Sequence, residues 1–254
     1  MIEKIIIGIQ ARTNSSRLPN KVLATINGEK LIFLMVKRLK SVKNISDIII
    51  CTTNENSDKK LIGIAKKRKI TVFGGSTNDL LDRFYQMGIK FNATIIVRIN
   101  ADCPLMDPNL IEKGLDKFMK SKKRPDLVTN ALVDTFPDGM QFGIFNFETI
   151  KKMWKTVNEP FWREYFFRYM LEKEEKFEIV NLTNSKNLSH LRWTVDYKED
   201  LEFVRAIVRK LKTHNFTMKQ ILSLLNNEPK INDINSMYSS KIGINEFTNL
   251  KNKL

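Results

Sequence analysis

Cysteine is scarce in this chain of 254 residues: the two that occur are Cys51 and Cys103. Two cysteines are too few for a disulfide framework, and neither has a CxxC or Cys/His spacing that would hold zinc. We therefore expect both thiols to be reduced, as in a cytoplasmic protein.

Long apolar runs are also missing. Nowhere do about 18 uncharged apolar residues follow one another, which is the length that crosses a bilayer. The first segment, MIEKIIIGIQ, carries Glu3 and Lys4 and has no small-residue cleavage site. The sequence thus predicts neither secretion nor a membrane span, and we expect no membrane partner.

Acidic residues are few relative to basic ones. The 28 Asp and Glu stand against 43 Lys and Arg, which gives a formal net charge of +15. This excess favours polyanionic partners: nucleic acid, an anionic membrane surface or phosphorylated small molecules. Much of it is Lys in a chain also rich in Asn and Ile, a bias that codon composition can produce, so we rank nucleic acid low among the partners.

The usual glycine-rich phosphate motifs are absent as well. No GxxxxGK[ST] is present and no GxGxxG follows the first predicted strand, so the common nucleoside-triphosphatase and dinucleotide interpretations lose their main support.

The first 150 residues alternate between β-rich apolar runs and amphipathic stretches, the pattern of strands joined by helical crossovers. Continuous apolar runs at 5–7 and 48–50 indicate strands covered on both faces, as in a parallel sheet. Apolar stripes at helical spacing over 31–42 and 80–91 predict helices. The predicted strands are 4–10, 47–53, 70–73, 93–99 and 126–130. The predicted fold class is α/β, with a mixed, mostly parallel sheet flanked by helices.

From about residue 136 the pattern is less regular. The predicted helix over 160–173 bears six aromatic side chains. We favour their packing on the sheet, with a homodimer face as the alternative. LRWTVD at 191–196 predicts a further strand, 198–211 and 217–225 predict helices, and the tail beyond 226 is expected to be partly extended.

Ligands of open parallel sheets bind beyond the carboxyl ends of the strands, so the loops there are informative. The loop 11–21 follows the first predicted strand and offers two guanidinium groups, an ammonium and three hydroxyls. Such a set suits a triphosphate, whose oxygens accept charge-assisted hydrogen bonds. A solvated basic loop is the alternative, which this position disfavours.

Two other predicted strands end in aspartate, at Asp102 and Asp196. Each alone could cap a helix, as we interpret Asp107 before Pro108. Together they would supply two hard oxygen ligands, which suits Mg²⁺ when substrate phosphates and water complete its coordination.

Five collinear segments carry a family resemblance. They are IIIGIQARTNSSRLPNKVL, GGSTNDLLDRF, VRINADCPLMDP, the pair FPDG and WREY, and LRWTVDYKEDL. Over about 200 residues the sequence resembles the spore-coat polysaccharide F-like cytidylyltransferases, which are related to the synthetases that activate Kdo and sialic-type sugars as CMP derivatives. The resemblance implies a Rossmann-like nucleotidyltransferase fold that binds CTP and Mg²⁺ and releases pyrophosphate.

The resemblance also implies roles for individual residues. Asp102 matches the first metal aspartate and Asp196 the second. The predicted nucleotide-binding residues are Ala11, Arg12, Ser16, Arg17, Lys21, Ser76, Asp79, Arg83 and Arg98. Of these, Arg12, Ser16, Arg17 and Lys21 match the triphosphate-binding signature, and Arg12, Lys21 and Asp102 are the predicted catalytic set.

Acceptor recognition is expected from the second half. Asp138, Arg163 and Glu164 are the candidates, with Arg163 suited to a carboxylate; Arg163 and Glu164 could equally form a surface pair. The sequence departs from the family at Asn20, where a Gly usually precedes the Lys, and at Tyr165, where His is common. We describe the chain as a single domain over 1–254, with 136–190 as an acceptor-binding and dimerisation subregion and 197–254 as a C-terminal helical extension.

The predicted reaction is in-line attack of an acceptor oxyanion on the α-phosphorus of CTP, with Mg²⁺ held by the two aspartates. A metal-dependent nucleotide-sugar glycosyltransferase is one alternative, although Asn100 and Asp102 imitate its Asp-x-Asp element only partly. A basic nucleic-acid-binding protein is the other, and it leaves the paired aspartates without a purpose. We expect a cytoplasmic homodimer acting on CTP and a small acceptor.

Overall fold

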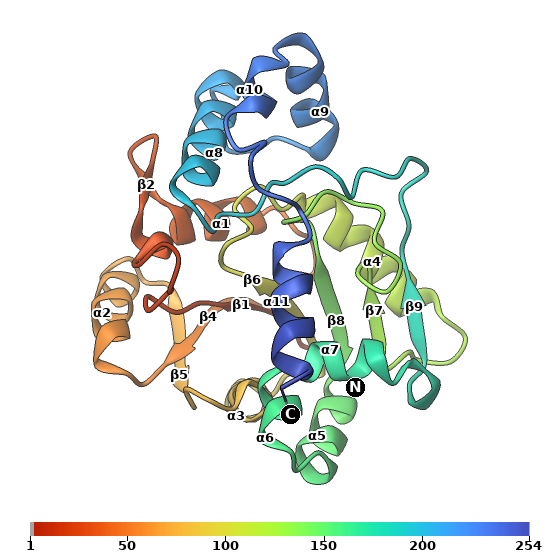
Figure 1. Ribbon diagram of the computed structural model, residues 1–254. Coiled ribbons are helices and arrows are strands. Elements are labelled where there is room, and N and C mark those ends of the chain that lie inside the picture. The colour runs from red at the N-terminus through yellow and green to blue at the C-terminus, as the bar shows by residue number, and fades with distance from the viewer. Residues whose placement is uncertain (1–2, 254) are drawn as a thin grey trace.

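A seven-stranded sheet organises the computed structural model, which describes residues 3–253; the strand order is β5-β4-β1-β6-β8-β7-β9 (Figure 1). The strands of this sheet are β1 Ile5–Gln10, β4 Asp47–Thr53, β5 Thr71–Gly75, β6 Ile95–Asn100, β7 Leu127–Thr129, β8 Phe142–Asn146 and β9 Ile179–Asn181, and a small hairpin pairs β2 Thr25–Ile26 with β3 Glu29–Lys30. The α-helices are α1 Leu31–Leu39, α2 Lys59–Lys67, α3 Leu80–Lys90, α4 Pro108–Lys120, α5 Phe147–Thr156, α6 Pro160–Glu164, α7 Phe166–Glu172, α8 Lys198–Leu211, α9 Met218–Asn227, α10 Lys230–Asp233 and α11 Ile242–Lys251. Short 3-10 turns lie at Lys21–Leu23, Asn56–Asp58 and Glu174–Lys176.

The parallel half of the sheet follows the apolar runs. β1 lies between β4 and β6 and pairs parallel with both, and β5 adds a fourth parallel strand beside β4. Side chains of β1 alternate between two cores: Ile5, Ile7 and Ile9 pack on one face and Ile6 on the other. Because both faces are covered by helices, each strand can be apolar at every position, and the predicted α/β class is confirmed.

The other half of the sheet is mixed. β8 pairs antiparallel with both β6 and β7, and β9 joins the edge parallel to β7. The sequence did not reveal β8, because its FGIFN segment lies within an aromatic stretch in which apolar and polar residues do not alternate with a period of two.

Three predictions for the C-terminal half were wrong. The expected helix over 160–173 is two helices that meet at Tyr165, where φ is −105° and ψ is 37°. LRWTVD joins no strand of the sheet and makes only a bridge between Asp138 and Arg192. The tail expected to be partly extended contains α10 and α11, and α11 crosses back in front of the sheet towards α6 and α7 (Figure 1).

The aromatic helix finds its cover within the chain. Phe166 and Phe167 are buried on the sheet side, as favoured from the sequence. Phe161 and Tyr165 instead meet Phe247 of α11, with ring centroids 5.7 and 5.3 Å apart. The homodimer stays a prediction. Among residues 3–253, every helix is too short or too polar to cross a bilayer.

Candidate active site

A cavity of about 440 Å³ opens beyond the carboxyl ends of β1 and β6. Gln10 and Asn100, the last residues of these strands, line it, together with the loop after β1, the α6–α7 corner and α11. The predicted residues that line it are Ala11, Arg12, Ser16, Arg17, Lys21, Arg83, Arg98, Asp102, Asp138, Glu164 and Asp196.

Lys21 joins the two predicted metal aspartates at the centre of this cavity. Its Nζ lies 2.9 Å from Asp102 Oδ2 and 2.8 Å from Asp196 Oδ1, and it donates to the Val195 carbonyl at 2.8 Å. Burial acts to lower the pKa of Lys21, but the two carboxylates outweigh it and hold the pKa above its usual value. The ammonium is therefore charged at neutral pH.

Local backbone geometry brings these groups together. Asn20 takes the left-handed conformation, with φ 59° and ψ 20°, and the 3-10 turn that begins at Lys21 follows directly. Asn tolerates this region better than most residues, so the departure from Gly is accommodated. On the opposite side, Val195 N–H donates to the Asp102 carbonyl at 2.8 Å, which places Asp196 beside Asp102.

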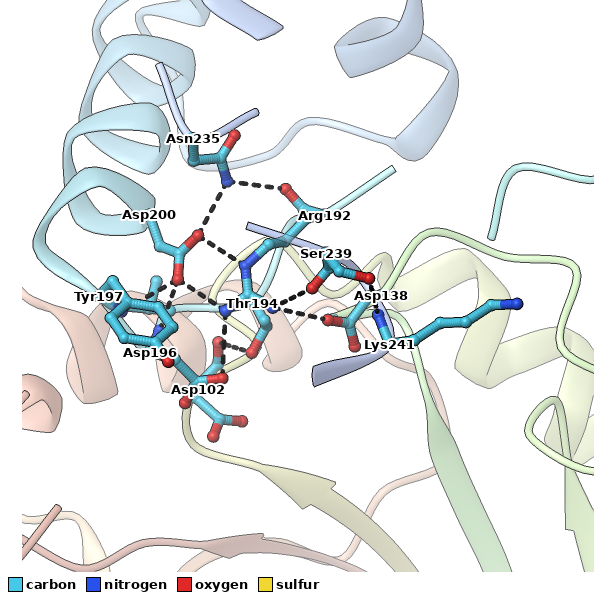
Figure 2. A network of polar contacts seen from close by, with 12 residues as sticks. Asp102, Asp138, Arg192, Thr194, Asp196, Tyr197, Asp200, Asn235, Ser239 and Lys241 are labelled. Carbon is cyan, nitrogen blue, oxygen red and sulfur yellow. Dashed lines mark hydrogen bonds and ion pairs between the residues drawn. The ribbon is translucent and has the colours of Figure 1, made fainter. Parts of the chain in front are cut away.

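A buried network fixes the Asp196 backbone (Figure 2). Arg192 forms a two-pronged contact with Asp200, at 2.9 Å from Nε and 2.8 Å from Nη2. Asp200 accepts the backbone N–H of Asp196 at 2.9 Å and of Tyr197 at 3.0 Å, and Asn235 donates to it at 2.9 Å. Sequence reasoning saw the acidic pattern after Asp196 but not that Arg192 and Asp200 support it.

The basic loop faces the same centre. Arg17 Nη2 lies 2.8 Å from Asp196 Oδ1, while its Nη1 pairs with Glu246 of α11. Burial acts to raise the pKa of Asp196, but Lys21 and Arg17 outweigh it and the pKa lies below its usual value. Arg12 lines the cavity, is exposed, and has no hydrogen bond or ion pair within residues 3–253.

Asp58 anchors this loop from below. Its Oδ1 accepts from the backbone N–H and hydroxyl of Thr13, both at 2.7 Å. Its Oδ2 accepts from the Thr52 hydroxyl at 2.7 Å and from the N–H and hydroxyl of Thr53 at 3.1 and 2.6 Å. Asp58 is fully buried, and no motif in the sequence had singled it out.

Two further acidic residues, Asp134 and Asp138, line the cavity. Burial raises the pKa of Asp138 to about 7, although Arg192, whose Nη1 lies 3.5 Å from Asp138 Oδ2, acts in the opposite direction. Asp134 accepts from Gln141 at 3.3 Å, and burial raises its pKa too. Tyr165, the second departure from the family, also lines the cavity.

Three predicted residues do not line the cavity: Ser76, Asp79 and Arg163. Asp79 caps α3 by accepting the Asp82 N–H at 2.8 Å, and Arg163 Nε lies 2.6 Å from Asp79 Oδ2. Arg163 also donates to the carbonyls of Trp154 and Val157 at 3.0 and 2.8 Å. Nε and Nη1 of Arg163 are therefore engaged within the chain, and its carboxylate partner is Asp79 and not Glu164, as the surface-pair alternative had it. The acceptor role of Arg163 stays a prediction.

The donor set at the centre fits a magnesium ion completed by substrate. Within the described part of the chain, no three His, Cys, Asp or Glu side chains gather as a closed metal cage. Asp102 and Asp196 nevertheless bind one cation together, the Lys21 ammonium. Two carboxylates that leave room for phosphate oxygens and water are what Mg²⁺ accepts.

Comparison with known proteins agrees with this geometry. A family model described as cytidylyltransferase matches residues 5–247. The chain belongs to the cytidylyltransferase family. The solved structure of a cytidylyltransferase from Leptospira borgpetersenii is 31% identical, with a TM-score of 0.85 over 91% of this chain and 96% of that one. The predicted Rossmann-like nucleotidyltransferase fold is thus confirmed.

Two curated relatives are similar in sequence to this cytidylyltransferase. The spore coat polysaccharide biosynthesis protein SpsF of Bacillus subtilis is 25% identical over 89% of this chain and 95% of its own length. The 8-amino-3,8-dideoxy-manno-octulosonate cytidylyltransferase of Shewanella sp. strain ANA-3 is 29% identical over 48% of this chain and 50% of its own. The first confirms the resemblance drawn from the five sequence segments.

Proposed function

We propose that this cytidylyltransferase transfers CMP from CTP to a sugar acid or a similar small acceptor and releases pyrophosphate, for the synthesis of a cell-surface polysaccharide. The observation that carries the proposal is the convergence of Asp102, Asp196 and Lys21 within 2.9 Å contacts, beside the unpaired Arg12. A carboxylate pair facing several cations suits a metal-bound triphosphate better than a nucleotide sugar, whose diphosphate carries less charge.

The protein's own residues bind and orient in this scheme. Arg12, Ser16 and Arg17 would hold the β- and γ-phosphates, and Lys21 would neutralise charge on the departing pyrophosphate. Asp102 and Asp196 would hold Mg²⁺, which when bound withdraws charge from the phosphate oxygens. The acceptor would enter the cavity beside Asp138 and meet the α-phosphorus in line.

The test is a pyrophosphate-release assay with CTP and Mg²⁺ on Asp102→Asn. Losing one preorganised contact typically costs about 3 kcal/mol of barrier, roughly a hundredfold in rate. We expect that loss with an unchanged far-ultraviolet spectrum. Asp116→Asn, an exposed carboxylate paired with Lys120, is the matched control and should keep full activity. Near-normal turnover by Asp102→Asn would refute the assignment.

The same assay separates the competing schemes. Release of a nucleoside diphosphate from a donor sugar, without pyrophosphate from CTP, would indicate a glycosyltransferase instead. The cytoplasmic location and the homodimer remain predictions from the sequence.

A further inference from the structure

One cation of the cavity, Arg168, has no acceptor for its side chain in the part of the chain that the structure describes. Arg168 lies on α7, lines the cavity and is half-buried. Within residues 3–253 its guanidinium makes no hydrogen bond and no ion pair. Its guanidinium carbon lies 5.7 Å from the centroid of the Phe247 ring of α11.

Four other cations of the cavity contact protein acceptors with at least part of their donors. Arg17 and Lys21 pair with carboxylates, and Arg83 donates to the carbonyls of Ser76 and Thr77 at 2.7 and 3.1 Å. Arg98 donates from Nη2 to Gln10 and Asn100, although its buried Nε has no partner among the described residues. Within residues 3–253, Arg12 and Arg168 are the cavity cations whose side chains make neither a hydrogen bond nor an ion pair, and Arg12 lies in the basic loop, where the triphosphate is expected.

A half-buried charge without a partner is unfavourable, so its presence in a cavity wall points to a ligand that pairs with it. Burial lowers the pKa of Arg168, and the carboxylates of Asp134, Glu172 and Asp138 act in the opposite direction without forming an ion pair with it. Glu172 is already engaged with Lys251. An incoming anion would therefore meet a guanidinium whose five donors are free to form a fork.

Two carboxyl groups near Arg168 affect which kind of anion can bind there. Asp134 and Asp138 line the cavity near Arg168, and both are rich in acceptor oxygens. When ionised, they would repel a dianionic phosphate more than a singly charged carboxylate. Their oxygens suit hydroxyl or ammonium groups of a sugar.

We propose that Arg168 binds the carboxylate of the acceptor and so selects an acid over a neutral sugar or a sugar phosphate. This inference rests on the proposed CMP transfer. It assigns the acceptor carboxylate to Arg168 of α7, which lines the cavity, in place of Arg163 of α6, the candidate from the sequence.

The experiment measures pyrophosphate release from CTP and Mg²⁺ with 3-deoxy-manno-octulosonate, N-acetylneuraminate, the C1 amide of each, and mannose 1-phosphate. We expect turnover with an acid and none with its amide or the phosphate. Arg168→Gln should raise KM for that acid roughly 10- to 100-fold, the range for a hydrogen-bonded charge, while KM for CTP stays within about twofold. Arg168→Lys should recover part of the loss. Arg209→Gln, an exposed arginine on α8, is the control and should behave as wild type.

Failure of this inference differs from failure of the proposed function. Turnover of an amide as fast as its acid, preference for the phosphate, or an unchanged acid KM in Arg168→Gln would overturn the role of Arg168 alone. Absence of CTP binding by calorimetry would overturn the proposed function. If CTP binds and no acceptor turns over, titration of both acids into the CTP-loaded protein decides: binding that Arg168→Gln abolishes supports the inference, and no such binding refutes it.

Discussion

Asp58 provides the sharpest test of how the basic loop after β1 is held in place. The buried carboxylate accepts five hydrogen bonds, two from Thr13 and three from Thr52 and Thr53. In Asp58→Asn the amide nitrogen must replace one of the two oxygens. Hydroxyl groups can rotate to accept from it, but a backbone N–H cannot, so the N–H of Thr13 or of Thr53 loses its partner in either orientation.

The expected cost follows from that count. One buried N–H without an acceptor costs about 1–3 kcal/mol, and the remaining bonds lose their charge assistance, so we expect about 3 kcal/mol of destabilisation in total. Thr13 is also the pivot of the loop, because its carbonyl accepts the N–H of Ser15 and Asn20 at 3.0 and 2.9 Å. KM for CTP should therefore rise as well.

Urea unfolding at several pH values checks this prediction. Burial acts to raise the pKa of Asp58, but the threonine hydrogen bonds outweigh it and the folded pKa lies below the ordinary 3.8. Its stabilisation is thus complete above about pH 5 and is lost as the pH falls through the folded pKa, so the gap between wild type and Asp58→Asn should close in acid. Asp116→Asn should unfold within about 0.5 kcal/mol of wild type. An Asp58→Asn protein equally close to wild type at pH 7 would refute the reasoning.

Two further predictions concern the walls of the cavity. Glu246→Gln removes the carboxylate that shares Arg17 with Asp196, so KM for CTP should fall by up to roughly fivefold, and added salt should reduce this effect. Steady-state kinetics at two ionic strengths measure the change in KM. An unchanged or higher KM would contradict the prediction. Burial raises the pKa of Asp138 to about 7, although Arg192 acts to lower it. Between about pH 4 and pH 7 the folded protein therefore keeps a proton on Asp138 that the unfolded chain has lost. Ionisation of Asp138 then destabilises the fold as the pH rises from about 4 to 8. Asp138→Asn should gain stability relative to wild type over that range in urea unfolding, whereas a constant difference would show that Asp138 ionises without penalty.

Local signals in the sequence located much of the candidate site. The loop after β1 was recognisable because its cations and hydroxyls follow a buried strand, and Asp102 because it follows another. Asp196 lies beside Asp102, as predicted, but not because it ends a strand. LRWTVD is not a strand of the sheet, and Val195 contacts Asp102 through a single backbone hydrogen bond.

Other parts of the site have no local signature. Arg163 and Arg168 lie five positions apart and have similar aromatic neighbours in the sequence. The break between the two helices at Tyr165 separates them, so that Arg163 pairs with Asp79 and Arg168 lines the cavity. In the sequence, Asp58 cannot be told from any other acidic residue that precedes a helix. Only the structure shows that Thr13 donates to it.

The sequence by itself determined the parallel half of the sheet, because a strand covered on both faces is visible as a continuous apolar run along the chain, and it located the basic loop after β1. The tertiary structure alone decided the antiparallel pairing of β8, the return of α11 over the cavity and the absence of a hydrogen-bond or ion-pair partner for Arg168 among residues 3–253. Those features depend on contacts between segments tens to hundreds of positions apart, which residue spacing along the chain does not encode.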